Sequence, residues 1–216
     1  MISLGLFGWC YVVRYGAVGL APRGIAGPLA ADLVLFSLFA LHHSIMARTG
    51  AKRWLTEHFP ATLERSAYVW VASLLFAWTC LAWQEIPVLL YEVHAPWRYA
   101  CFGVQLAGVW MTVRAAGVID VLDLAGIRQA HGRLRAAVFK VIGPYHVVRH
   151  PIYLGWMLMT FGTPTMTGTR LAFAMISTSY LALAVPFEER SLIEEFGDEY
   201  RAYQQRVRWR MVPGIY

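Results

Sequence analysis

The sequence predicts an all-α integral membrane protein, and three observations support this fold class. Hydrophobic residues fill 58% of the 216 positions and charged residues only 15%, whereas a soluble domain carries roughly 25% charged residues. Nearly uncharged runs of about 20 residues, the length that crosses the hydrocarbon core of a bilayer, recur along the chain. Lys and Arg gather in the segments between these runs, as a membrane topology requires. We therefore expect a single polytopic helical bundle over residues 1–216, with about five to six transmembrane helices.

Apolar runs place the helices in order along the chain. The runs long enough to span a membrane once each are 2–20, 28–46, 66–84 and 97–118. A further apolar region, 151–187, contains Arg170 as its single charge and is interrupted by Gly and Pro within 162–168. Because Gly and Pro clusters punctuate helices, this region predicts a helical hairpin with a short first arm. The second arm is expected to continue to Phe196 and stop at Gly197, before a further short helix.

The charge of the connecting segments predicts which side of the membrane each one faces. Segments 47–65, 119–150 and 188–216 hold most of the Lys and Arg residues, whereas 85–96 holds none. Because cytoplasmic loops are enriched in Lys and Arg, we expect the three basic segments and the N-terminus in the cytoplasm. Any chemistry that involves a water-soluble molecule is therefore expected at the cytoplasmic face.

Composition also argues against several classes of function. The formal net charge is +6, but the basic residues form no continuous stripe, so nucleic-acid binding is not expected. Anionic membrane lipids account for part of this charge. Cys10, Cys80 and Cys101 lie in apolar runs without metal-ligand spacing, so we expect neither a disulfide nor a metal site. Rossmann, P-loop and zinc-protease motifs are absent, so membrane helices and their loops must build any nucleotide-type cofactor site.

The segment 143–155, which reads GPYHVVRHPIYLG, is the first candidate for a functional site. Pro151 suits the first turn of a helix and places His150 beside the free N–H groups of that turn. Such a helix start attracts anions, including carboxylates, and Tyr145 and Tyr153 would cluster with the histidine there. The same residues also suit an ordinary interfacial anchor, with Arg and His at the headgroups and Tyr in the aromatic belt. The residues alone leave both interpretations open.

Two further polar groups stand at the ends of apolar runs. Glu188 and Glu189 directly follow the last run. A carboxylate at a membrane edge can accept a ribose diol or an ammonium, or it can simply mark where a helix enters water. His42 and His43 close the second run, where one imidazole could act as a base or both could form a polar helix end.

Taken together, these segments resemble the isoprenylcysteine carboxyl methyltransferase and phospholipid methyltransferase superfamily of integral membrane enzymes. The shared pattern is G-x-Y-x-x-x-R-H-P-x-Y-x-G, an apolar hairpin and then E-E-x-x-L-x-x-x-F-G-x-x-Y-x-x-Y, which this chain matches at 143–155 and 188–203. The upstream sequences HSIMAR, KRWL and ERSAYVWVASLLFAW resemble the methanethiol S-methyltransferase and NnrU-like branch. The resemblance extends over most of the chain and implies a location in the bacterial inner membrane, with a cytoplasmic C-terminus.

The resemblance implies that S-adenosyl-L-methionine is the cofactor and that residues within about 129–216 hold it. The implied cofactor-binding residues are Gln129, Ala137, Val138, Phe139, Lys140, Tyr145, His150, Pro151, Ile152, Tyr153 and Glu188. The chain departs from the family at His146, where relatives commonly carry Arg. A second departure is Ala184, where the isoprenylcysteine enzymes carry a substrate-binding Arg, and this argues against a prenylated carboxylate as substrate.

Transfer of a sulfonium methyl group needs mainly a positioned, deprotonated nucleophile. For a small thiol the thiolate reacts, so Arg149, His42 and His43 are the expected catalytic residues, either as a positive field or as a base. We therefore expect methylation of a small thiol such as methanethiol, giving dimethyl sulfide. Two alternatives remain: methylation of a lipid amine or prenylcysteine that enters from the bilayer, and a non-catalytic NnrU-like membrane protein of nitrogen-oxide metabolism.

Overall fold

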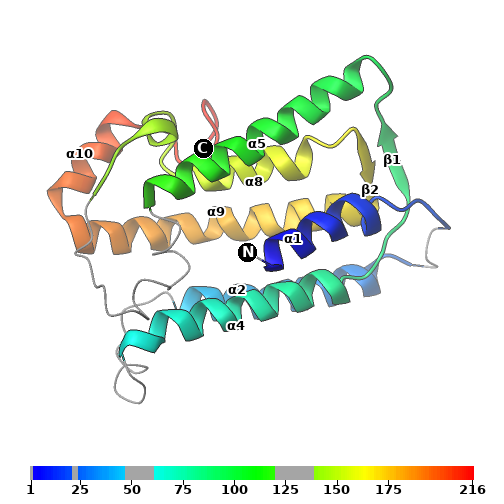
Figure 1. Cartoon of the computed structure of the whole chain (residues 1–216), viewed down its shortest axis with the longest axis horizontal. Coiled ribbons are helices and arrows are strands. Elements are labelled where there is room, and N and C mark those ends of the chain that lie inside the picture. The colour runs from blue at the N-terminus through cyan, green and yellow to red at the C-terminus, as the bar shows by residue number, and fades with distance from the viewer. Residues whose placement is uncertain (1, 21–23, 47–60, 120–138) are drawn as a thin grey trace. The chain divides into compact units, whose positions relative to one another are not determined.

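The structure, a computed structural model, describes residues 2–20, 24–46, 61–119 and 139–216 (Figure 1). The N-terminal elements are the α-helix α1 (Ile2–Trp9), the π-helical segment η1 (Cys10–Arg14), α2 (Ala26–Met46), α4 (Ala61–Ala82) and the strand β1 (Leu89–Glu92). The remaining elements are α5 (Trp97–Ile119), the 3₁₀ turn η2 (Gly143–His146), α8 (Pro151–Phe161), the strand β2 (Thr165–Thr167), α9 (Gly168–Phe196) and α10 (Asp198–Arg206).

Helices dominate the described residues, which confirms the predicted class of a helical membrane protein. Three of the described helices are long and apolar enough to cross a bilayer: α2, the part of α5 up to Val118, and α9. Ile2–Arg14, Ser66–Ala82 and Pro151–Phe161 form shorter apolar helices. The expected runs 28–46 and 97–118 match α2 and α5 closely, whereas the expected run 2–20 is helical only as far as Arg14.

The described residues fall into two compact units. The first contains described residues up to His94 together with Pro164–Ile176, and the second contains Ala95 to Ile119, the residues from Phe139 to Thr163, and Ser177–Tyr216. Helix α9 contributes to both units.

Phe173 of α9 lies at the centre of the first unit, where it is completely buried. Its ring packs against Trp83, Phe7 and Tyr15, with centroid separations of 5.0, 5.3 and 5.5 Å. In the same unit β1 and β2 pair antiparallel, with Leu89 opposite Thr167 and Glu92 opposite Thr165 (Figure 1). The sequence did not predict this ladder, because strands of four and three residues are too short to show a periodic pattern.

Arg170, the single charge of the 151–187 region, occupies the end of η1. Its Nε donates to the Tyr11 carbonyl at 3.1 Å and its Nη2 donates to the Val12 carbonyl at 3.0 Å. The last carbonyls of a helix have no donor within the helix, so a buried guanidinium there satisfies them. Arg170 therefore belongs to the packing of the first unit.

The other charges within the apolar runs of this unit also have partners. Arg14 pairs with Glu85, with 2.7 Å between Nε and Oε1. Asp32 is completely buried, and its Oδ1 accepts the backbone N–H of Gln84 at 2.7 Å. These contacts agree with the rule that isolated charges in membrane helices are paired or hydrogen-bonded.

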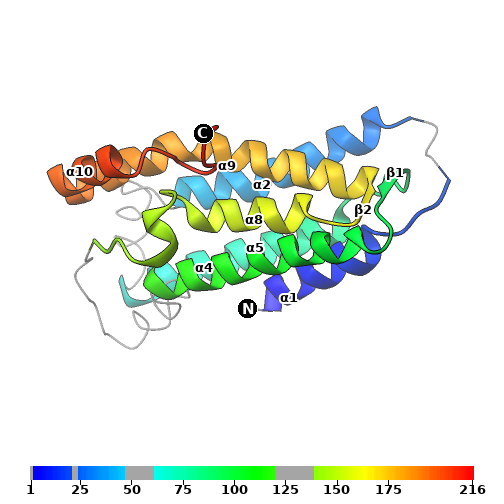
Figure 2. The same ribbon diagram turned by 90° about the horizontal axis from the view of Figure 1, so that it is seen from above.

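In the second unit α8 lies along α5 (Figure 2). A Cβ atom placed on Gly108 of α5 would lie 2.6 Å from the Gly155 carbonyl oxygen, and a Cβ on Gly155 would lie 2.7 Å from the Gly108 oxygen. Both distances are shorter than any van der Waals contact, so the two backbones can approach only because both residues are glycine. Membrane helices commonly associate through small residues in this way.

Local chemistry sets the ends of α8, α9 and α10 in this unit. Helix α8 begins at Pro151 with His150 as its N-cap residue, as predicted. Helix α9 continues to Phe196, and Gly197 follows with a φ of +57°, a conformation that favours glycine. The hydrogen bond from Trp156 Nε1 to Ser177 Oγ, 2.9 Å long, joins α8 to α9, consistent with the predicted hairpin.

Candidate active site

His150 stands where the main chain turns into α8. Its φ and ψ are −121° and 66°, which are not helical, and Pro151 occupies the first turn. The imidazole is buried and stacks on Tyr153, with centroids 5.3 Å apart and an interplanar angle of 12°. The backbone N–H of His150 donates to the Arg210 carbonyl at 2.8 Å. The ring therefore packs on its own helix, and the backbone of His150 is held by the chain at Arg210.

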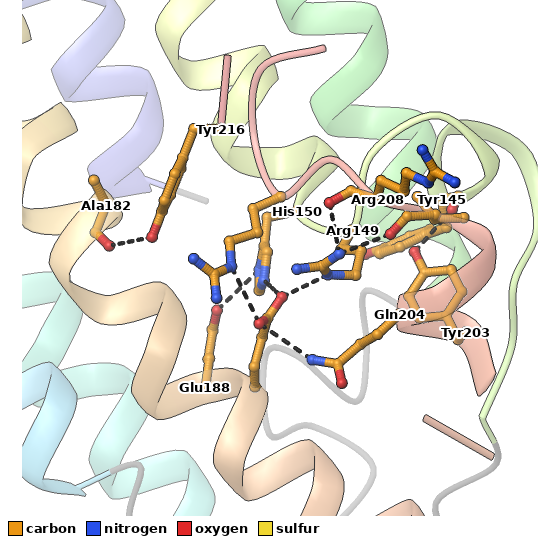
Figure 3. A network of polar contacts seen from close by, with 12 residues as sticks. Tyr145, Arg149, His150, Ala182, Glu188, Tyr203, Gln204, Arg208 and Tyr216 are labelled. Carbon is orange, nitrogen blue, oxygen red and sulfur yellow. Dashed lines mark hydrogen bonds and ion pairs between the residues drawn. The ribbon is translucent and has the colours of Figure 1, made fainter. Parts of the chain in front are cut away.

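Glu189 is buried and is the centre of a polar network. Figure 3 shows this network, in which Arg149, His150 and Gln204 are labelled. The Oε1 atom of Glu189 accepts a hydrogen bond from Arg149 Nε at 2.6 Å. Its Oε2 accepts from Gln204 Nε2 at 3.2 Å and from Arg210 Nε at 3.3 Å. Several donors on one buried carboxylate offset the cost of removing the charges from water.

The guanidinium of Arg149 is directed at the backbone as well as at Glu189. Its Nη1 donates to the carbonyls of Val207 and Arg208, at 2.7 and 2.8 Å. The side chain is buried, and its charge is paired with the carboxylate. Arg149 thus ties the turn before α8 to the chain that follows α10.

Glu188 has different surroundings from its neighbour. Its side chain is 49% exposed, and its Oε2 lies 3.2 Å from His150 Nδ1. The other ring nitrogen, Nε2, lies 3.4 Å from Glu189 Oε1, an ion-pair distance without the geometry of a hydrogen bond. His150 therefore stands between two carboxylates, one buried and one open to solvent.

These carboxylates set the charge of His150. Burial lowers the pKa of the imidazole, but the adjacent Glu188 and Glu189 raise it more, so the pKa lies above its ordinary value of 6.5. When this imidazole is protonated, it offers a positive charge beside a helix N-terminus and next to the negative charge of the half-exposed Glu188 carboxylate. This pair suits a ligand that carries a carboxylate together with a cation or a diol.

Aromatic residues form one wall of this region. Phe139 packs against Phe196, Tyr200 and Tyr203, with centroid separations of 5.3, 5.6 and 5.3 Å. The Tyr203 hydroxyl donates to the Tyr145 carbonyl at 2.7 Å. Burial, aided by the negative charge of Glu188, raises the pKa of Tyr145 to about 12, so its hydroxyl stays protonated and can donate.

The structure places the predicted cofactor residues as follows. Tyr145, His150, Pro151, Ile152, Tyr153 and Glu188 all belong to the second unit, as do Phe139 and Lys140. Gln129, Ala137 and Val138 lie outside the described residues. Of the expected catalytic residues, Arg149 is in the network around Glu189.

The expected catalytic residues His42 and His43 belong to the first unit, at the end of α2. The Tyr68 hydroxyl lies 2.8 Å from His43 Nδ1. The His42 ring stacks on the Tyr68 ring, with centroids 6.2 Å apart. The two imidazoles therefore share one tyrosine as a neighbour.

Sequence reasoning missed most of the network around His150. The sequence pattern indicates Glu189 only as the neighbour of Glu188, and it indicates no role for Gln204, Arg210 or Tyr216. Two acids that are adjacent in a helix face different sides of it, but their positions in the sequence do not show which side is buried. Arg210 lies 60 positions after His150 in the chain, and no local pattern joins such residues.

Comparison with known proteins gives several similar sequences. The chain is 35% identical to "Methanethiol S-methyltransferase 2" of Bradyrhizobium diazoefficiens, over 96% of the chain and 82% of that protein. It is 37% identical to a methanethiol S-methyltransferase of a Pseudomonas species, over 85% of the chain and 74% of that protein. It is 35% identical to the methanethiol S-methyltransferase of Mycobacterium tuberculosis, over 96% of the chain and 90% of that protein. No protein-family model and no solved structure matches the chain.

Proposed function

The chain belongs to the methanethiol S-methyltransferase branch of the isoprenylcysteine methyltransferase-like superfamily, and from this premise we propose that it methylates methanethiol with S-adenosyl-L-methionine, giving dimethyl sulfide. The observation that carries the proposal is the pairing of His150 with the half-exposed Glu188 at the start of α8, within a chain so similar to these enzymes.

The residues at this pair fit S-adenosyl-L-methionine by their chemistry. The molecule presents a carboxylate, a ribose diol and two positive groups. Protonated His150 and the N-terminal turn of α8 suit the carboxylate, and the open carboxylate of Glu188 suits the diol or a cation. We propose that Tyr145, Ile152 and Tyr153 shape the pocket around them. We propose the same for Phe139, Lys140, Pro151, Gln129, Ala137 and Val138.

The bound cofactor supplies an electrophilic methyl group on a sulfonium sulfur. His150 and Glu188 would hold the cofactor so that the thiolate sulfur of methanethiol could accept this methyl group. The thiol proton leaves to a base or to water. This reaction depends on placement and desolvation more than on strong acid–base groups, so the task of the chain is to hold the reactants in line.

We propose a positioning role for Arg149 and a proton-accepting role for His42 or His43. Arg149 is already paired with Glu189, so it acts by fixing that carboxylate and, with it, His150. A neutral imidazole can accept the thiol proton and increase the fraction of reactive thiolate. Replacing each histidine by Gln tests this role. Because only the neutral imidazole accepts a proton, kcat should rise with pH in the wild type, and this rise should be lost only in the variant that lacks the base.

We also propose that the shorter apolar helices complete the membrane domain, with about five to six spans in all. Exposed Trp70, Leu74 and Trp78 form a stripe with helical spacing on α4, which suits contact with lipid. The basic segments 47–65, 119–150 and 188–216 then face the cytoplasm of a bacterial inner membrane.

The direct test uses purified protein in detergent. Isothermal calorimetry with S-adenosyl-L-methionine measures binding, and gas chromatography measures dimethyl sulfide formed from methanethiol. We expect both signals from the wild type and a loss of at least about tenfold in affinity for Glu188→Gln, since a charge-assisted contact contributes about 1.5–3 kcal/mol.

The control is Glu92→Gln, which removes an exposed carboxylate from β1 in the first unit.

A second experiment separates thiol methylation from lipid methylation. The protein is given labelled cofactor together with either methanethiol or a lipid extract. Labelled lipid without labelled dimethyl sulfide would contradict the proposed acceptor, and an absence of cofactor binding would contradict the proposal as a whole.

A further inference from the structure

Residues Arg208–Tyr216, here called the C-terminal segment, are bonded to the main chain of the site. Arg149 N donates to the Trp209 carbonyl at 2.9 Å, and His150 N donates to the Arg210 carbonyl at 2.8 Å. The segment is also fixed internally, because three of its N–H groups donate to the Tyr216 carbonyl oxygen. The turn that presents His150 is therefore held against a folded segment.

Arg210 gives the segment a second attachment, through side chains. Its Nε lies 3.3 Å from Glu189 Oε2. Its guanidinium carbon lies 5.1 Å from the centroid of the Tyr216 ring, a cation–π distance. Tyr216 thus holds the guanidinium in place on one side while Glu189 binds it on the other.

The third attachment depends on a proline within α9. Pro186 has no N–H, so the carbonyl of Ala182, four residues earlier, loses its donor within the helix. The Tyr216 hydroxyl donates to this carbonyl at 3.4 Å (Figure 3). The attachment is therefore on α9 itself, six residues before Glu188.

From these three attachments we infer that the C-terminal segment positions the cofactor site, with Arg210 and Tyr216 as positioning residues that fix His150 and Glu188. The inference rests on the proposed function, because both residues are assigned there to S-adenosyl-L-methionine. The attachments end at Arg149 and His150, at Glu189, and at Ala182 in the same helix as Glu188. Loss of an attachment is therefore expected to weaken cofactor binding and to leave the KM for the thiol unchanged.

Graded substitutions in the full-length protein test the inference. Tyr216→Phe keeps the ring and removes only the hydroxyl, so we expect the Kd for S-adenosyl-L-methionine to rise about threefold, since a long hydrogen bond is near the weak end of its range. Arg210→Gln removes a charge-assisted bond, and we expect a rise of about tenfold. Arg210→Lys keeps the charge and should restore part of this loss.

Matched controls separate positioning from general damage. Arg201→Gln removes an exposed arginine whose partner is Asp198, and Tyr99→Phe removes an exposed hydroxyl on α5. Both should leave the Kd and the thermal midpoint unchanged. If Arg210→Gln does not fold, Tyr216→Phe carries the test, because it removes a single oxygen atom.

Pro186→Ala tests the mechanism of the third attachment. It supplies the N–H that can donate to the Ala182 carbonyl, so the Tyr216 hydroxyl is no longer needed there. Adding Tyr216→Phe to Pro186→Ala should then cause no further rise in the Kd.

Three outcomes would overturn the inference. They are an unchanged Kd in both Arg210→Gln and Tyr216→Phe, an equal rise in the KM for methanethiol, and full additivity of Tyr216→Phe with Pro186→Ala. A wild type that binds no S-adenosyl-L-methionine would instead overturn the proposed function, and the inference with it. A normal wild type with unaffected variants would overturn only the inference.

Discussion

Glu188 and Glu189 are neighbours in the chain, but their carboxylates have different tasks because they face different surroundings. Glu189 is buried and accepts hydrogen bonds from Arg149, Gln204 and Arg210. Glu188 is half-exposed, and its Oε2 lies 3.2 Å from His150 Nδ1. The first carboxylate thus fixes the site, and the second remains open for a ligand.

Removing the charge of Glu189 should destabilise the protein strongly. Glu189→Gln leaves Arg149 as a buried cation without its carboxylate, and breaking a buried pair in this way costs about 3–5 kcal/mol. The measurement is the thermal midpoint in detergent. Asp198→Asn, which removes an exposed carboxylate, is the control and should leave the midpoint unchanged. Equal midpoints for wild type and Glu189→Gln would show that the pair does not stabilise the fold.

The raised pKa of His150 predicts how stability depends on pH. Because the folded protein binds this proton more tightly than the unfolded chain, protonation stabilises the folded state. The contribution is complete below the ordinary pKa of 6.5 and is lost as the pH rises through the higher folded pKa. The difference in thermal midpoint between wild type and His150→Gln should therefore shrink from acidic to alkaline buffer. A difference that grows with pH would contradict the sign of this shift.

At the scale of whole elements, glycines decide how closely α5 and α8 approach. Gly108 and Gly155 each lie against the other's backbone, and Gly162 at the end of α8 lies against Val104. The position of the start of α8, and therefore of His150, depends on how closely α8 packs against α5. A packing feature between two helices therefore influences the candidate active site.

Gly108→Ala should destabilise the α5–α8 pair. The new Cβ would lie 2.6 Å from the Gly155 carbonyl oxygen, so one backbone must shift, and overpacking of this kind costs about 1–3 kcal/mol. Gly103→Ala on the same helix is the matched control, because a Cβ there meets nothing within 4 Å. The midpoint of thermal unfolding should fall for the first variant and be retained in the second. Equal midpoints would mean that the helices are farther apart than described.

Elements with local signals could be predicted from the sequence, and elements held by distant contacts could not. Pro151 and Gly197 mark helix ends by their own backbone chemistry, and both predictions were confirmed. The π-helical segment η1 depends on Arg170, whose position is more than 150 residues away, and no local pattern indicates it. The resemblance implies the proposed cofactor residues. The contacts of Glu189, Arg210 and Tyr216 depend on which distant segments fold together, and no local pattern predicts them.

At the scale of the whole molecule, composition and topology connect the fold to its substrate. Large apolar side chains are exposed on the long helices, such as Leu33 on α2, Leu106 on α5 and Leu183 on α9. Exposed apolar surface of this kind suits contact with lipid. Methanethiol is small and apolar, so it can reach a membrane enzyme through the bilayer, whereas the charged cofactor must arrive from water.

The proposed topology predicts which residues a membrane-impermeant thiol reagent can reach. In a variant without Cys10, Cys80 and Cys101, we introduce single cysteines by His94→Cys or Lys140→Cys, both at exposed positions. Residue 94 lies in segment 85–96, which holds no Lys or Arg, and should react in intact cells. Residue 140 should react only after the membrane is opened. The reverse pattern would invert the orientation, and reaction of both in intact cells would contradict an odd number of spans between them.

Arg170 also has a consequence for the order in which the protein is built. A ribosome completes the residues of η1 long before it makes α9, and until α9 arrives the Tyr11 and Val12 carbonyls lack the guanidinium that later binds them. Arg170 likewise is a costly charge in an apolar helix until it binds the carbonyls of η1. The carbonyls at the end of η1 therefore lack this partner until most of the chain has been made. The order of synthesis, and not only the finished fold, therefore matters for the contact between η1 and α9.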